Sequence, residues 1–171
     1  RFLSELGKDG DFKTPSNRFV RQWQMLSPHE RTRDDIGHYG RKILAEDFDG
    51  YVWLPLYSMV SGEAPAAEAL DVVGRGRNRY AVTRTFLDMK KPGTIKLKIT
   101  GKLADLDLFH GGKEIKLPEN GTEAILDLPI KKAGPQKLTL VGLKAYGLNR
   151  YAVELLDDAS VVDFIAIKDF Q

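Results

Sequence analysis

The chain has 171 residues, 42% of them hydrophobic and 29% charged, which is the size and composition of one ordinary folded domain. It contains no cysteine, and this excludes disulfide scaffolds, zinc ribbons and thiol catalysis. No apolar run approaches the roughly 18 to 20 residues that cross a bilayer, so we expect no membrane span. The formal net charge of +2 is too small to indicate a nucleic-acid partner.

The first third of the chain has little regular pattern. Aromatic and aliphatic residues predict strands over residues 18–26 and 49–57, and an alanine-rich stretch over 63–70 predicts one short helix. Residues 1–17 and 27–47 are polar and carry Pro and Gly, so we expect irregular or loop segments packed on the domain.

From residue 80 onward, apolar and polar residues alternate with a period of two, which is typical of strands with one buried face. In the clearest strand, Ile95 and Leu97 share the face opposite Lys96. In the segment 103–109, the alternation predicts that Asp105 and its neighbour Asp107 face outward. The paired glycines 111 and 112 predict a tight hairpin turn. The predicted strands cover residues 80–89, 94–99, 103–109, 114–117, 124–130, 136–143, 150–156 and 161–167.

These strands are short, are joined by turns and have no helix between them. Such intervals are too short for the crossovers of a parallel sheet. The sequence therefore predicts an all-β fold: an antiparallel β-sandwich of the jelly-roll type, formed as a single domain over residues 1–171, with at most a short helix in its N-terminal half.

The positive charge is concentrated in one segment. Residues 74–100 carry eight basic side chains and one acidic one, with the densest group at Arg75, Arg77 and Arg79. One interpretation is a solvated strand face and a polar loop. The other is an anion-binding patch for an acidic polysaccharide or a partner protein, because guanidinium groups bind carboxylates and sulfates bidentately.

Several segments resemble the galactose-binding-like jelly-roll modules attached to bacterial glycan-degrading proteins. The opening Phe19-Val20-Arg21-Gln22-Trp23-Gln24-Met25-Leu26-Ser27-Pro28 is similar to the aromatic-x-x-x-Trp-x-x-Leu-Gly-Pro-Phe start of these modules. The hairpin Leu106–Ile115, the segment Ala133–Leu140 and the closing Val162–Ile167 follow in the order of the family. The resemblance covers roughly residues 18–28 and 80–167, and it implies a galactose-binding-domain-like fold with a carbohydrate-binding role. Ser27 and His29 flank the proline where the family has Gly and Phe, and Gly111 stands where its hairpin has Asn.

Carbohydrate binding needs aromatic rings to stack on sugar C–H surfaces, flanked by groups that hydrogen-bond hydroxyls. We expect Trp23 to be a core residue, whereas Trp53 fits either the core or a ligand site. The candidate ligand-binding residues lie in three clusters, which are Tyr51, Trp53 and Tyr57; Arg75, Arg77 and Asn78; and Tyr146, Asn149 and Arg150.

Two further sites remain open alternatives. Glu46, Asp47 and Asp49 are spaced closely enough to share a structural calcium, although solvated loop acids explain them as well. His38, Tyr39 and Arg41 imitate the residues of a small jelly-roll polysaccharide lyase. No zincin, P-loop, dinucleotide or nucleophile-elbow motif is present.

The function expected from the sequence is a non-catalytic, carbohydrate-binding-type accessory module of a larger bacterial protein, extracellular or periplasmic. Its partners would be a polysaccharide or oligosaccharide, acidic or neutral, and the neighbouring domains of a longer chain. The alternatives are a structural or protein-interaction domain without a glycan site, and a small lyase.

Overall fold

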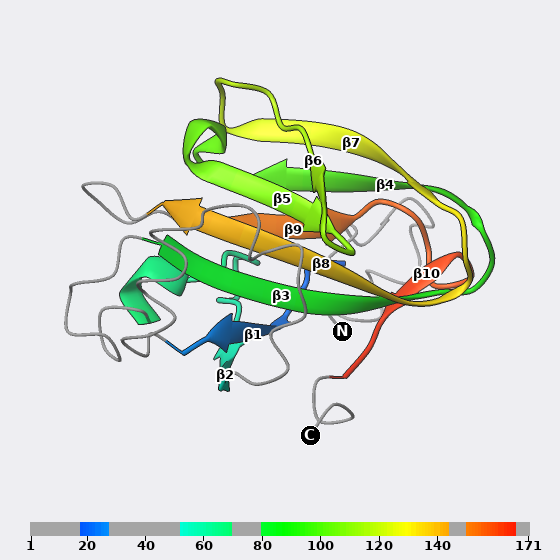
Figure 1. Ribbon diagram of the computed structural model, residues 1–171, viewed down its shortest axis with the longest axis horizontal. Coiled ribbons are helices and arrows are strands. Elements are labelled where there is room, and N and C mark those ends of the chain that lie inside the picture. Colours follow the sequence, from blue (N-terminus) through cyan, green and yellow to red (C-terminus); the bar gives the residue numbers. More distant parts are fainter. Residues whose placement is uncertain (1–17, 28–51, 70–79, 144–149, 167–171) are drawn as a thin grey trace, which may run out of the picture.

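The computed structural model describes residues 18–27, 52–69, 80–143 and 150–166, and these form two antiparallel sheets. The larger sheet has the strand order β2-β1-β3-β8-β5-β6, with β10 also pairing with β3. Figure 1 shows its long strands β3, β8 and β5 side by side. Its strands are β1 (Gln22–Leu26), β2 (Trp53–Tyr57), β3 (Tyr80–Met89), β5 (Leu106–His110), β6 (Lys113–Ile115), β8 (Gly134–Leu143) and β10 (Val162–Phe164).

The smaller sheet has the order β7-β4-β9, and the main core lies between the two sheets. Its strands are β4 (Gly93–Thr100), β7 (Glu123–Ile130) and β9 (Ala152–Leu155). The alternation in β4 gives the predicted result, because Ile95, Leu97 and Ile99 are fully buried in the core. The antiparallel sandwich of the jelly-roll type is therefore confirmed.

Polar side chains of β3 also enter the core, each with a hydrogen bond. Thr83 is fully buried, and its hydroxyl donates to the Leu140 carbonyl and accepts from the Tyr151 hydroxyl. Thr85 donates to the Gln22 carbonyl at 3.2 Å. Burial raises the pKa of the Tyr151 phenol. These bonds remove the penalty of burying hydroxyl groups, so β3 turns its threonines inward and its other face outward.

The predicted strand 18–26 is divided between the two sheets. Arg18 and Val20 extend the smaller sheet, since the Val20 amide donates to the Val153 carbonyl and the Leu155 amide donates to the Arg18 carbonyl. The chain then crosses to the larger sheet, where β1 begins at Gln22. A run of apolar residues does not reveal such a change of partner.

The prediction of a strand beginning at residue 103 is wrong, because Leu103–Asp105 forms a 3-10 turn and β5 begins at Leu106. The turn is closed by a bond from the Asp105 amide to the Lys102 carbonyl. Asp105 does not face outward as expected. Its carboxylate is largely buried and lies 3.3 Å from the Lys102 ammonium.

The turns carry the conformations that their glycines predict. Gly111 and Gly112 have φ of 56° and 89° in the hairpin between β5 and β6, as a primed turn requires. The predicted helix over 63–70 is described as a helical turn over residues 66–69. In the described part of the chain, no helix is long and apolar enough to cross a membrane.

Candidate functional site

The most distinctive described surface is the outer face of the larger sheet, which is the face turned away from the smaller sheet. Strand register places its side chains in rows, because residues paired across antiparallel strands point to the same side. Gln24 pairs with Arg84, and Arg84 pairs with Thr139. On β2, Trp53 pairs with Leu26 and Tyr57 with Gln22. The outer face thus combines aromatic rings with a guanidinium group, and the Gln24 amide and the Thr139 hydroxyl lie buried on it.

Arg84 lies at the centre of this face and is held from several sides. Its guanidinium carbon lies 3.8 Å from the centroid of the Trp53 ring and 5.3 Å from that of Phe86. Its Nε donates to Gln24 Oε1 at 2.8 Å. A guanidinium stacked on an indole and bonded to an amide loses little further freedom when a ligand binds.

Trp53 is half-buried and packs against a second buried cluster on the outer face, formed by Leu26, Val82, Phe109 and Val141. Its ring also stacks on the Arg84 guanidinium. The core prediction is therefore partly right, and a role of Trp53 in ligand binding stays a prediction.

Tyr57 supplies exposed aromatic surface on the same face of β2 as Trp53. Its side chain is 64% exposed, whereas the alternate residue Leu56 is buried. Trp23, by contrast, is 1% exposed, as expected of a core residue. An exposed ring on the same sheet face as an ordered arginine provides both a stacking surface and hydrogen-bond donors.

The structure separates the described cations of the basic segment, whereas Arg75, Arg77 and Arg79 lie outside the described residues. Lys96 is exposed and Lys98 partly exposed on the outer face of the smaller sheet, and Lys98 pairs with Glu123 at 3.3 Å. Lys90 pairs with Asp88 at 2.9 Å, which raises the pKa of the Lys90 ammonium. For the two lysines of β4, the solvated-face interpretation is confirmed.

Arg150, a predicted ligand residue, has a carboxylate partner within the chain. Its Nε and a terminal nitrogen donate to the two oxygens of Glu68 at 2.6 Å and 3.2 Å. These hydrogen bonds lower the pKa of the Glu68 carboxyl and raise that of Arg150. The pair joins the helical turn 66–69 to the start of the segment that contains β9, which indicates a structural role.

We expect Glu68→Gln to lower the free energy of unfolding more near neutral pH than in acid. The pKa of Glu68 is lower in the folded protein than in the unfolded chain. The pair therefore contributes fully to the free energy of unfolding at a pH above the usual pKa of a glutamic acid. This contribution disappears as the pH falls through the folded pKa. Urea denaturation at several pH values measures the difference from wild type, with the exposed Glu119→Gln as the control. If Glu68→Gln destabilises the protein as much at pH 3 as at pH 7, the charge of Glu68 does not contribute to stability.

The remaining predicted residues lie outside the described part of the chain, and their roles stay predictions. No group of three or more His, Cys, Asp or Glu side chains among the described residues is placed to hold a metal ion. This leaves calcium at the predicted acids untested. The residues concerned are Tyr51, Arg75, Arg77, Asn78, Tyr146 and Asn149 for ligand binding, Glu46, Asp47 and Asp49 for calcium, and His38, Tyr39 and Arg41 for a lyase.

Sequence reasoning missed Gln24 and Phe86, and it treated Arg84 only as one cation in a segment. The available signal was the alternation Val82, Arg84, Phe86 on one side of β3, with threonines on the other. That pattern does not identify which face is the core.

The chain matches no protein-family model and no curated protein by sequence. Its fold is similar to part of the β-glucuronidase of Ruminococcus gnavus in complex with D-glucaro-d-lactam, with a TM-score of 0.50, 12% identity and coverage of 80% of this chain and 29% of that chain. A GH2 β-galacturonidase of Eisenbergiella tayi bound to galacturonate gives a TM-score of 0.46 at 11% identity, over 80% of this chain and 23% of that chain. The CBM35 of Paenibacillus barcinonensis gives a TM-score of 0.36 at 16% identity, over 47% of this chain and 73% of that chain.

The chain therefore spans less than a third of the length of the two glycosidases. At 12% identity, the likeness to the Ruminococcus gnavus enzyme shows a shared fold and nothing more.

Proposed function

We propose that this chain is a non-catalytic, carbohydrate-binding-type accessory module of a larger extracellular or periplasmic bacterial protein. Its glycan site lies on the outer face of the larger sheet. The exposed Tyr57 stacks on a sugar ring, Arg84 hydrogen-bonds hydroxyl groups, and Trp53 and the buried Gln24 position Arg84.

The observation that carries this proposal is the exposed Tyr57 ring on the same face of β2 as Trp53, whose ring stacks on Arg84. A sugar presents C–H faces and hydroxyl edges, and this face offers an aromatic ring for the first and a guanidinium for the second. The shared fold with part of a β-glucuronidase agrees with this role, although fold alone does not determine function.

Tyr57→Ala is expected to weaken glycan retention by roughly 5- to 30-fold, the equivalent of about 1 to 2 kcal/mol. The ring is exposed, so its removal leaves a buried core untouched and the melting temperature nearly unchanged. Affinity electrophoresis in gels containing neutral or acidic polysaccharides measures the retention.

Ile125→Ala is the matched control, because Ile125 is 60% exposed but lies on the smaller sheet. If both variants lose retention equally, the outer face of the larger sheet is not the site. If the wild type is retained by no polysaccharide, the proposed function fails.

The exposed turn after β2 favours a second candidate, a protein-interaction domain. Val60 is 97% exposed, and the turn is held by bonds from Arg21 to the Met59 and Val60 carbonyls. A rigid apolar tip is suited to contact with a neighbouring domain. Absence of glycan retention, together with binding of the adjoining domain that Val60→Ser abolishes, would favour this role.

A further inference from the structure

Two strands share one edge of β3 at different positions and leave a wedge between them. β1 pairs with β3 at Thr83 and Arg84, whereas β10 pairs with it from Leu87 to Met89. Between these ladders, the Ile165 amide donates to the Phe86 carbonyl at 3.1 Å. This division of a sheet edge leaves space that neither strand fills.

The space is a cavity of about 260 Å³. Its apolar wall is made by Val20, Phe164, Ile165 and Ala166. Its polar lining is made by Arg21, Gln22 and Thr85. Cavities for drug-sized ligands span roughly 300 to 1,000 Å³, so this one suits a single ring rather than an oligosaccharide.

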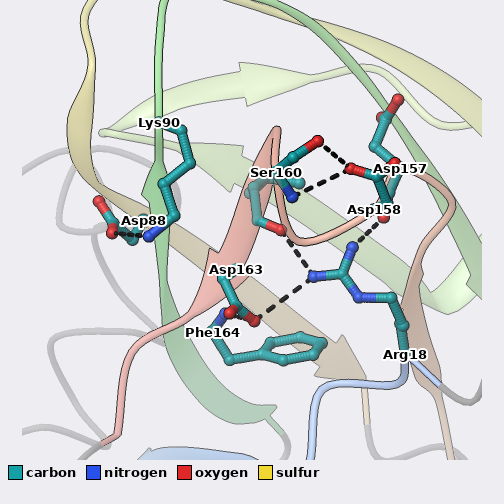
Figure 2. Close-up of polar contacts among 9 residues, drawn as sticks. Arg18, Asp88, Lys90, Asp157, Asp158, Ser160, Asp163 and Phe164 are labelled. Carbon is teal, nitrogen blue, oxygen red and sulfur yellow. Dashed lines mark hydrogen bonds and ion pairs between the residues drawn. The ribbon is translucent and has the colours of Figure 1, made fainter.

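The aromatic wall of the wedge is fixed in place by Arg18. The guanidinium of Arg18 lies 5.7 Å from the centroid of the Phe164 ring. It also donates to the Val162 carbonyl at 2.6 Å and to Asp163 Oδ1 at 3.4 Å, as Figure 2 shows. The acidic side chain nearest this wall is thus already paired with a cation.

Arg21 brings a positive charge to the wedge without a carboxylate partner among the described residues. One terminal nitrogen donates to the Met59 and Val60 carbonyls at 2.8 Å and 3.1 Å, and the guanidinium lies over the Phe19 ring. These contacts orient the side chain and occupy one of its three nitrogens. Guanidinium N–H groups bind a carboxylate strongly, because both partners are charged.

We propose that the wedge binds one carboxylate-bearing sugar residue, a uronate, with its ring against Phe164 and its carboxylate at Arg21. This inference rests on the proposed function, which makes a sugar the ligand. Gln22 belongs to the wedge and also pairs with Tyr57 on the outer face. Phe164 packs against the main core and Thr85 turns inward, so the wedge opens on the core side of this sheet edge. A glycan on the outer face passes round the edge at Gln22 to place a neighbouring or terminal residue in the wedge.

Titration calorimetry with digalacturonate and with its neutral dimethyl ester tests this proposal on the whole chain. The wild type is expected to bind the acid about tenfold more tightly than the ester, a preference that 1 M NaCl removes. Arg21→Gln is expected to abolish the preference, and Ala166→Phe to abolish binding by filling the wedge. Lys131→Gln, which removes an exposed lysine elsewhere, should change nothing.

Arg21→Lys keeps the charge and guards against loss of fold in the glutamine variant, and it should retain part of the preference for the acid. Equal binding of acid and ester by the wild type overturns the proposal, as does unchanged affinity in both Arg21→Gln and Ala166→Phe. Glycan retention that Tyr57→Ala weakens but the wedge variants leave intact refutes the wedge alone. Without retention of any polysaccharide, the proposed function fails, and the digalacturonate titration still decides whether the wedge binds the acid.

Discussion

Replacement of Trp23 by alanine is expected to lower the free energy of unfolding by about 3 to 5 kcal/mol, the usual cost of truncating a buried tryptophan. Trp23 lies between the sheets, and its ring meets Tyr151 edge-on with centroids 5.9 Å apart. Its indole nitrogen donates to the Ser58 hydroxyl at 3.0 Å, and that hydroxyl donates to the Val20 carbonyl. Truncation removes the packing of the indole ring and leaves the Ser58 hydroxyl without its hydrogen-bond donor.

Urea denaturation followed by circular dichroism measures this loss, and Trp53→Ala is the matched comparison. Trp53 is half-buried and packs on the smaller cluster, so its removal should cost clearly less stability while weakening glycan retention. Equal destabilisation by the two substitutions would contradict their separation into a core residue and a site residue.

Gly62→Ala is expected to destabilise the protein by about 2 to 6 kcal/mol. Gly62 has φ of +92°, where a side chain costs about 1 to 3 kcal/mol of backbone strain. A Cβ atom at this position would also lie 2.5 Å from the Phe19 ring, and relief of such overpacking typically costs about 1 to 3 kcal/mol. The chain must bend sharply here, because Ala64 pairs with Tyr151 immediately afterwards.

Gly93→Ala is the control, because a Cβ atom there meets nothing within 4 Å and the backbone does not have positive φ. Its effect on thermal unfolding should be close to zero. If the Gly62→Ala and Gly93→Ala proteins have the same melting temperature, neither the backbone conformation of Gly62 nor its contact with Phe19 constrains this turn.

The sequence predicted the sandwich well where one face of a strand is wholly apolar. β4 is such a strand, and its apolar residues and lysines separate without ambiguity. β3 was found with its observed bounds, 80–89, yet its two faces are both mixed. Because buried threonines satisfy their hydroxyls with carbonyls on other strands, only the folded chain identifies which face is the core.

The site was less predictable, because it depends on strand register. Trp53 and Arg84 lie far apart in the sequence, and they meet only because β1 pairs with both β2 and β3. The wedge is less visible still, since it forms where β1 and β10 share one edge of β3. Arg150 looked equally suited to a ligand until its pairing with Glu68 was apparent.

The central claim is that glycan binds the outer face of the larger sheet, and mapping of amide chemical shifts during titration with a retained oligosaccharide tests it most directly. We predict saturable shifts at Gln24, Tyr57, Arg84 and Phe86, with little change at Lys96 and Lys98. Shifts confined to the smaller sheet, or to residues remote from β1, β2 and β3, would contradict the assignment.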